Sequence, residues 1–320
     1  MGDILNNMEK EIKKSFMEFI KDFPETKNVK KEANGEEGSP FLQWVGGKRG
    51  LIENYKSYFP KSFNQYFEPF LGGGAMFFKL KPDKAYLGDN NLELIRTFKA
   101  VKEKPDEVVF LLSELRKRHS KELYLFIRNL DRNENIIKEF EDFEIAARMI
   151  YLNQTGFNGI YRVNKKGQFN VPIGSSLNRT ICDSNRIKQA SNILKNTTIA
   201  CSDFSEAIKI ASEGDFVYLD PPYSPISKYS DFTRYTKEKF YEKDQKRLKE
   251  SIDELTKKKC FVMLSNSDCD FIRKLYSGYK IIEFSKKRLL SSKSSQRNQE
   301  IGELLILNYE GDTLLEPKEQ

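Results

Sequence analysis

Histidine is nearly absent from this chain, which has a single one, His119, among 320 residues. One histidine excludes a histidine-rich metal site and argues against Ser-His-Asp catalysis, so we expect His119 to be a surface residue in a charged helix. Cysteine is also sparse. Four thiols show neither the spacing of a zinc site nor the density of a disulfide framework, so we expect reduced, buried residues without a role (Cys182, Cys201, Cys260 and Cys269). No run of 18 apolar residues is present, which argues against a membrane span.

The charge of the chain is basic and unevenly distributed. Lysine and arginine number 54 against 47 acidic residues, a net charge of +7. Residues 1–40 carry a net charge of −2, whereas residues 96–195 hold 19 basic and 12 acidic side chains and residues 270–300 hold eight and three. Two basic stretches favour a polyanionic partner. Solvated helix faces explain the same charge equally well when it is taken alone.

The chain divides into three parts by its hydrophobic pattern. Apolar residues at helical spacing predict an amphipathic helix over residues 3–22, and the charged stretch 27–40 is typical of a linker. We therefore expect residues 1–40 to be an appendage. Strand-like and helical patterns alternate after Pro40, which predicts a largely parallel sheet with helices on both faces and an antiparallel final pair of strands.

The expected strands cover residues 65–68, 85–88, 197–201, 216–220, 260–265, 279–284 and 303–308. The expected helices cover residues 91–103, 105–118, 121–130, 139–152, 183–194, 204–212, 237–258 and 268–277. About 110 residues separate the second strand from the third, far more than one crossover requires. We therefore predict an insertion domain over residues 96–195, containing a hairpin at 161–171, and a main domain made of residues 41–95 and 196–320.

Two features favour a nucleoside-containing ligand at the ends of the first two strands. Residues 67–74 read Phe-Glu-Pro-Phe-Leu-Gly-Gly-Gly, a strand followed by a glycine-rich turn that lets a ligand approach the backbone. Phe77 stands where a dinucleotide fingerprint needs glycine, which argues against NAD. Asp89 ends the next strand, where an acid accepts hydrogen bonds from ribose hydroxyls. The alternative for Asp89 is an N-cap of the helix that follows.

The most specific pattern is Asp220-Pro221-Pro222-Tyr223, directly after an apolar strand. Two prolines end the strand and fix an extended turn. Such a turn presents the Asp220 carboxylate, the Pro221 carbonyl and the Tyr223 ring in one direction. Two acceptors and an aromatic face suit a planar base with an exocyclic amino group.

Residues 220–223 resemble the Asp-Pro-Pro-Tyr motif of DNA amino-methyltransferases, and residues 67–74 resemble their S-adenosylmethionine motif. The order of the motifs is that of the alpha group, which contains the Dam-type adenine N6-methyltransferases. The motif at 41–48 (Phe-Leu-Gln-Trp-Val-Gly-Gly-Lys), the ribose motif at 88–91 and the DNA-reading hairpin at 158–172 are similar as well. The resemblance runs from about residue 40 to 309 and implies a Rossmann-like methyltransferase sheet with a helical and hairpin insertion for DNA recognition.

The resemblance implies methyl transfer from S-adenosylmethionine to N6 of an adenine that has left duplex DNA, without a metal. It implies catalytic roles for Asp220, Pro221, Pro222 and Tyr223. Its cofactor residues correspond to Trp44, Lys48, Phe70, Gly72, Gly74, Asp89, Asn90, Asp203, Phe204 and Asp220. Its DNA contacts correspond to Phe157, Asn158, Arg162, Asn164, Lys165, Lys166, Pro172, Arg288, Lys293 and Arg297.

One departure concerns the DNA site. Dam-type enzymes that recognise GATC commonly have a basic residue after the segment equivalent to 172–174, and Ser175 stands there instead. The resemblance therefore implies GATC or a related recognition site, and Ser175 argues against GATC itself.

Three alternatives stay open. Cytosine N4 methylation uses the same kind of pocket. A protein glutamine methyltransferase typically has asparagine in place of Asp220 and lacks a basic insertion. A DNA-binding regulator that had lost catalysis would have no need of both intact motifs. The expected partners are duplex DNA and a cognate restriction endonuclease, and the expected state is a monomer or weak dimer in the cytoplasm, at the nucleoid.

Overall fold

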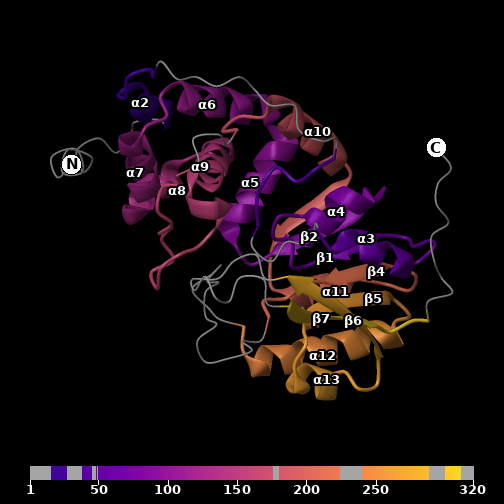
Figure 1. The fold of residues 1–320 in the computed structure, drawn as a ribbon. Helices are drawn as coiled ribbons and strands as arrows, with labels where there is room; N and C mark the ends of the chain where they lie inside the picture. Colours follow the sequence, from indigo (N-terminus) through magenta and orange to yellow (C-terminus); the bar gives the residue numbers. More distant parts are fainter. Residues whose placement is uncertain are drawn as a thin grey trace.

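The computed structural model describes residues 16–26, 38–44, 48, 50–175, 180–223, 240–287 and 300–310. Within these residues the protein is a mixed α/β structure built on a seven-stranded sheet of order β3-β2-β1-β4-β5-β7-β6 (Figure 1). The strands are β1 (Tyr66–Glu68), β2 (Ala85–Asp89), β3 (Thr197–Cys201), β4 (Phe216–Leu219), β5 (Phe261–Ser267), β6 (Lys280–Lys287) and β7 (Glu300–Leu307). The strand order is that of a doubly wound sheet in which β7 is inserted between β5 and β6.

Strand direction agrees with the sequence pattern. β1 pairs in parallel with β2 and β4, and the pairs β2–β3 and β4–β5 are parallel too. β7 runs antiparallel to both β5 and β6. The prediction of a largely parallel sheet with an antiparallel final pair is confirmed, and all seven expected strands are present in the described residues.

Helices lie between and beside the strands. They are α2 (Phe16–Lys21), α3 (Ile52–Tyr55), η2 (Lys56–Tyr58), α4 (Ala75–Leu80), α5 (Leu92–Glu103), α6 (Pro105–Lys117), α7 (Lys121–Asn129), η3 (Leu130–Arg132), α8 (Glu134–Glu139), α9 (Asp142–Thr155), η4 (Phe157–Gly159), α10 (Ser184–Leu194), α11 (Phe204–Ile210), α12 (Glu242–Lys257) and α13 (Asp270–Leu275). The hydrophobic pattern missed α3 and α8, which are too short to show a helical period.

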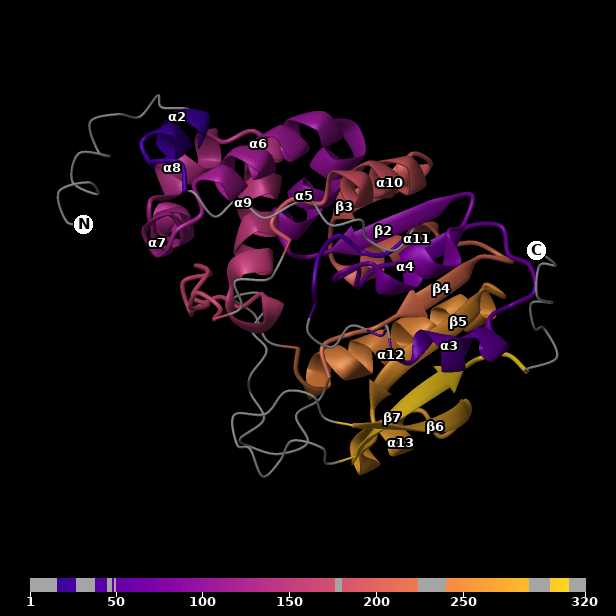
Figure 2. The ribbon, with the colours of Figure 1, turned by 45° about the horizontal axis from the view of Figure 1, so that its top comes forward.

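Successive strand residues face two different cores. Phe216 and Tyr218 of β4 pack with α3, α4, α5 and α10, whereas Val217 and Leu219 pack with α11, α12 and α13. This alternation follows from the two-residue period of a strand. Figure 2 shows helices on both faces of the sheet, and the central strand β4 is accordingly a fully buried apolar run.

The remaining helices, α2 and α6 to α9, form a group that we call the helical unit. Figures 1 and 2 show it to one side of the sheet, with α5 between the two. α5 contacts α9 on one side and β2 and β3 on the other. The expected start of an insertion at residue 96 therefore falls inside a helix that belongs to both parts.

The N-terminal helix packs on the helical unit. The backbone N–H of Phe16 donates to Glu144 Oε1 at 3.0 Å, and the Phe16 ring lies edge-on to Phe140 with centroids 5.3 Å apart. The Phe19 ring contacts Phe126 in a tilted arrangement, with centroids 5.7 Å apart. α2 is the described part of the helix expected over residues 3–22, and most of the expected linker lies outside the described residues.

Two expectations about single residues were wrong. His119 lies between α6 and α7 rather than in a helix, is half-buried, and has its Nδ1 2.8 Å from the Tyr151 hydroxyl. Burial lowers the pKa of His119. The cysteines are free thiols as expected, but Cys201 is exposed and Cys269 half-buried.

Candidate active site at the carboxyl edge of the sheet

The motif residues converge at the carboxyl edge of the sheet. β1 and β4 are parallel neighbours, so the glycine-rich turn after β1 and Asp220 after β4 lie at the same edge. The chain leaves β1 toward β2 on one side, while β4 lies on the other side, which makes this the switch point of the sheet. Open α/β sheets bind their ligands at that point.

The turn after β1 has the backbone that its glycines predict. Gly72 and Gly74 have φ angles of 48° and 67°, in the left-handed region that disfavours other residues. The Leu71 N–H donates to Gly88 O at 2.9 Å, which ties this turn to the end of β2. A Cβ on Gly72 would come within 2.9 Å of the Trp44 ring, so the turn and Trp44 lie in close contact.

Asp89, at the end of the neighbouring strand β2, accepts a hydrogen bond from the same turn. Its Oδ2 accepts the Gly72 N–H at 3.1 Å and its Oδ1 accepts the Asn91 N–H at 3.0 Å. Burial raises the pKa of Asp89, and these backbone donors counteract the shift. The helix that follows is capped by Asn91, whose side chain accepts the Leu94 N–H. The N-cap interpretation of Asp89 is therefore wrong, and the adjacent Asn90 is exposed.

Asp220 is held by two side chains through one oxygen. Its Oδ1 lies 2.9 Å from Lys48 Nζ and accepts a hydrogen bond from Ser265 Oγ at 2.9 Å. Lys48 also donates to the Tyr223 hydroxyl, and its Nζ lies 4.4 Å from the centre of the Tyr223 ring. Motifs that are 172 residues apart in sequence, at Lys48 and Asp220, thus form one cluster.

A second acid completes the cluster and was missed from the sequence. Glu303 Oε1 lies 3.3 Å from Lys48 Nζ and accepts the Tyr55 hydroxyl at 2.5 Å. Glu303 is only 4% exposed. Glu303 could have been recognised in the sequence as an acid within the apolar pattern of β7. Ser265 is likewise a polar residue that follows the apolar part of β5.

The pKa values in the cluster are set by burial and by the presence of one cation between two acids. Burial raises the pKa of Asp220, the Lys48 ammonium lowers it, and Glu303 raises it again, with a net increase. Burial would lower the pKa of Lys48, but Asp220 and Glu303 together raise it above its usual value. Lys48 is therefore a permanent cation shared by two carboxylates.

Pro222 connects the turn after β4 to α12 and β5. Pro222 O accepts a hydrogen bond from Gln245 Nε2 at 3.3 Å, and Gln245 Oε1 accepts one from Asn266 Nδ2 at 3.0 Å. Pro221 is buried, whereas Pro222 is exposed. The Pro222 carbonyl thus connects the turn after β4 to α12 and β5.

An aromatic group lies after the end of β3, where the resemblance implies cofactor contacts at Asp203 and Phe204. Phe204 stacks on Phe70 with centroids 5.3 Å apart, and the Arg247 guanidinium lies 4.5 Å from the Phe204 ring centre. Arg247 also pairs with Asp203 at 2.7 Å. Phe204 is 3% exposed, so it supports the surface formed by Phe70 and Asp203 more than it contributes to it. Arg247 was not among the residues predicted from the sequence.

The expected DNA-reading hairpin is present with its tip exposed. Val163 and Phe169 form its bridge, and Asn164 Oδ1 accepts the N–H groups of Lys166 and Gln168, which fixes the turn. Lys165 and Lys166 are exposed at the tip.

Arg162 is held within the hairpin, because its guanidinium donates to Asn170 Oδ1 at 2.8 Å. Phe157 is 46% exposed, and its N–H donates to Pro172 O at 2.9 Å. Asn158 has a φ of 55°. Arg288, Lys293 and Arg297 lie outside the described residues.

The hairpin is coupled directly to the glycine-rich turn. Tyr161 stacks on Trp44 with centroids 5.3 Å apart and planes 18° apart. Asn153, which is 1% exposed, accepts the Gln43 N–H and donates to the carbonyls of Gln43 and Gly159. Three hydrogen bonds from one buried side chain therefore hold the segment before Trp44 against the start of the hairpin.

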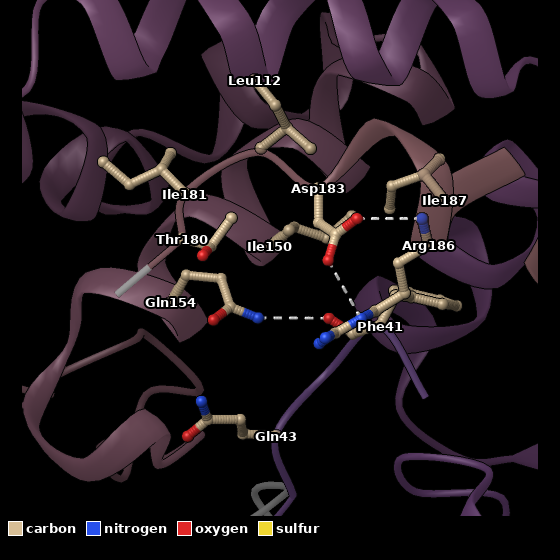
Figure 3. Close-up of a pocket in the computed structure, with 10 residues that line it drawn as sticks. All are labelled: Phe41, Gln43, Leu112, Ile150, Gln154, Thr180, Ile181, Asp183, Arg186 and Ile187. Carbon is tan, nitrogen blue, oxygen red and sulfur yellow. Dashed lines mark hydrogen bonds and ion pairs between the residues drawn. The ribbon is translucent and has the colours of Figure 1, made fainter. Parts of the chain in front are cut away.

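A cavity of about 160 Å³ lies away from this edge, between α6, α9, α10 and the segment around Phe41 (Figure 3). Gln154 Nε2 donates to Phe41 O at 3.2 Å, and Asp183 pairs with Arg186 at 3.3 Å. No residue expected to bind the cofactor or the target base lines it. Among the described residues, no group of three or more His, Cys, Asp or Glu is arranged to hold a metal ion.

Comparison with known proteins identifies the family. A family model described as D12 class N6 adenine-specific DNA methyltransferase matches residues 44–290. The chain belongs to this family. The match contains Trp44, Lys48, the glycine-rich turn, Asp89 and residues 220–223, whereas Glu303, residues 41–43 and α2 lie outside it.

The alignments of this chain with three curated relatives span nearly the full length of each relative. A type II methyltransferase of Lactococcus lactis subsp. cremoris is 43% identical over 84% of this chain and 95% of that protein. A type II methyltransferase of Methanocaldococcus jannaschii is 39% identical over 85% of this chain and 100% of that protein. The DNA adenine methylase of Escherichia coli K12 is 31% identical over 85% of this chain and 95% of that protein.

These comparisons confirm that the protein is an adenine-specific DNA methyltransferase. Membership of the D12 family implies S-adenosylmethionine as methyl donor and DNA as substrate. The cytosine, glutamine and inactive-regulator alternatives are thereby set aside. In the part of the chain that the structure describes, no helix is long and apolar enough to span a membrane.

Proposed function

We propose that Asp220, Pro221, Pro222 and Tyr223 form the catalytic turn at which the D12 methyltransferase modifies N6 of an adenine flipped out of duplex DNA. The observation that carries this proposal is the way Asp220 is held. Lys48 and Ser265 both contact Oδ1, so among the described residues Oδ2 is the oxygen left to accept a hydrogen bond. An oriented, ionised acceptor at the carboxyl edge is what an incoming amine needs.

The proposed chemistry relies on position rather than on acid–base strength. The N6 lone pair of adenine is delocalised into the ring, so the amine is a poor nucleophile. Hydrogen bonds from its two N–H groups to Asp220 Oδ2 and the Pro221 carbonyl would favour a tetrahedral nitrogen and expose the lone pair. Tyr223 would stack on the base, which must leave the duplex to reach this site. The scarcity of histidine is no handicap for such a reaction.

The residues at the edge fit S-adenosylmethionine, which supplies a methyl group already activated on a sulfonium. The left-handed turn at Gly72 and Gly74 lets a ligand approach the backbone, and the Asp89 carboxylate faces the same edge as an acceptor for ribose hydroxyls. Trp44 lies against the turn, and Lys48 lies beside Asp220. Phe70, Asn90, Asp203 and Phe204 provide the surface beyond Asp89.

For DNA, we propose that the insertion over residues 96–195 lies against the duplex. Lys165 and Lys166 would contact phosphates and Arg162 a guanine, after release from Asn170. Phe157 would fill the space near the flipped base, with Asn158, Asn164 and Pro172 shaping that end of the hairpin. Arg288, Lys293 and Arg297 would contact the backbone.

The biological setting is proposed from the relatives. Two of them are type II methyltransferases, which supports a cognate restriction endonuclease as partner. We propose a cytoplasmic monomer or weak dimer acting at the nucleoid on GATC or a related site, with Ser175 as a point of difference from GATC enzymes. Long-read mapping of modified adenines would give the sequence of the site.

The test is methyl transfer by Asp220→Ala to unmethylated DNA with labelled S-adenosylmethionine, followed by nucleoside analysis. We expect the wild type to label N6-methyladenine, and the variant to lose about 1000-fold or more in kcat because the oriented acceptor is gone. DNA affinity should stay within about threefold, since phosphate contacts supply most of it.

Asp83→Ala is the matched control, because Asp83 is an exposed turn residue before β2 and should transfer as the wild type does. Unchanged transfer by the Asp220 variant would remove Asp220 from the mechanism. Label in N4-methylcytosine would remove adenine as the target of this site.

A further inference from the structure

The buried cation at the active site serves two acids, only one of which belongs to the catalytic turn. Lys48 and Glu303 are 3% and 4% exposed. Lys48 Nζ lies 2.9 Å from Asp220 Oδ1 and 3.3 Å from Glu303 Oε1. Tyr55 binds the same Glu303 oxygen at 2.5 Å, so the carboxylate is fixed from two directions.

Strand direction explains how Glu303 reaches the site. β7 runs antiparallel to β5, and Glu303 is paired with Ser267 at the carboxyl end of β5. On its other side Glu303 is paired with Phe284 of β6. The residues after it, 304–307, are all buried and apolar. Burying a leucine at this position would cost less free energy than burying an ionised carboxylate, because the carboxylate loses its hydration.

Resting on the proposed function, we propose that Glu303 is a positioning residue for methyl transfer. Lys48 keeps Asp220 ionised and aimed. Glu303 shares the Lys48 ammonium with Asp220, so that Asp220 remains a stronger proton acceptor than it would be if it were paired with Lys48 alone. Glu303 acts through Lys48 and does not touch the target base.

The need for such sharing follows from the reaction. The N6 lone pair forms a bond to the methyl carbon, the electron pair of the methyl–sulfur bond stays on sulfur, and N6 releases one proton. That proton is hydrogen-bonded to Asp220 and passes through it to water. An acceptor paired with Lys48 alone would attract the proton weakly, whereas an unpaired one would be protonated beforehand.

Other ionisable groups near Asp220 do not substitute for Glu303. Among the described residues, Tyr66 and Glu68 face the cluster from β1, Tyr218 from β4, and Tyr55 and Tyr223 from α3 and the catalytic turn. The pKa of each tyrosine is raised by burial, so each is uncharged. The pKa of Glu68 is raised to about 8 by burial, with a contribution from Asp220.

The experiment measures kcat and KM across pH for the full-length protein and four variants. For Glu303→Gln we expect kcat to fall about tenfold or more while both KM values stay within about twofold, because ground-state contacts are intact. Removing the negative charge of Glu303 lowers the pKa of Asp220. The acid limb of the kcat profile should therefore move to lower pH by about half a pH unit or more.

Glu303→Asp keeps the charge, so it should restore part of kcat and the position of the acid limb. Glu283→Gln is the matched control, since Glu283 is an exposed acid of β6 that pairs with Arg273 outside the site. It should change neither kcat nor the profile.

Two results would overturn the role of Glu303. One is a Glu303→Gln enzyme with wild-type kcat and acid limb; the other is equal loss in the Gln and Asp variants with an unmoved limb, which would indicate packing alone. Asp220→Asn separates this inference from the proposed function. If it still transfers methyl groups, the proposed function fails; if it is inactive while Glu303→Gln behaves as the wild type, only the inference about Glu303 fails.

Discussion

At the scale of single residues, acids buried behind the catalytic turn set the local charge. Glu68 ends β1 beneath the glycine-rich turn and is 2% exposed. Its Oε2 accepts the Tyr66 hydroxyl at 2.9 Å and the Phe77 N–H at 3.1 Å. Burial raises the pKa of Glu68 to about 8, and nearby Asp220 adds to the shift. Glu68 is therefore uncharged at neutral pH and adds no third negative charge to the site.

This shift predicts a pH-dependent stability. The folded state holds a proton on Glu68 that the unfolded state releases above about pH 4.5, so the wild type loses stability as pH rises from there to about 8. Glu68→Gln cannot titrate. Relative to the wild type it should gain up to about 4 kcal/mol in the free energy of unfolding between pH 5 and 8.5. Urea unfolding across that range measures the difference, and parallel curves for the two proteins would contradict the assignment.

The sequence predicted the residues of the catalytic turn but only part of their surroundings. Asp220 and Tyr223 stand in a short motif whose prolines fix the backbone, so their convergence could be expected from local chemistry. Glu303 is far away in the sequence, and it reaches the cluster only because β7 is antiparallel. Strand pairing between distant segments is not encoded in any local pattern, which is why a buried acid in β7 carried no clear meaning beforehand.

At the scale of elements, the turn after β1 depends on glycine at Gly72. Its φ is 48°, and a Cβ there would meet the Trp44 ring at 2.9 Å. Gly72→Ala should therefore strain the turn and displace Trp44. We expect roughly tenfold weaker S-adenosylmethionine binding and about 1–2 kcal/mol lower stability. Calorimetric titration and thermal unfolding measure the two effects.

Gly278→Ala is the control for that change, because a Cβ on Gly278 meets nothing within 4 Å. It should leave cofactor binding unchanged. If both alanine variants bind S-adenosylmethionine like the wild type, the turn has no part in the cofactor site.

At the scale of the whole molecule, the folded core includes a helix that lies outside the residues matched by the family model. α2 precedes residue 44, yet Phe16, Phe19 and Ile20 are buried in the same core as the helical unit. The amphipathic period predicted the helix. Its partner surface could not be predicted, because Phe126 of α7 and Phe140, between α8 and α9, are brought together only by the tertiary fold.

Removing this contact should destabilise the protein. Phe16 is fully buried, so Phe16→Ala is expected to lower the free energy of unfolding by about 3 kcal/mol through lost burial and a residual cavity. Denaturant unfolding measures the change. Lys21→Ala, at an exposed position of the same helix, should change it by less than about 0.5 kcal/mol. Equal stability of the two variants would show that α2 is dispensable to the folded core.

Trp44 is the sole tryptophan of the chain, and it lies between the glycine-rich turn and the ring of Tyr161. Its emission therefore originates from one place, where any rearrangement of the turn or of the hairpin alters quenching by the stacked tyrosine. The protein thus carries an unlabelled optical reporter at the junction of its two proposed ligand surfaces. Stopped-flow mixing with S-adenosylmethionine, with DNA, or with both would resolve the order in which the two sides move.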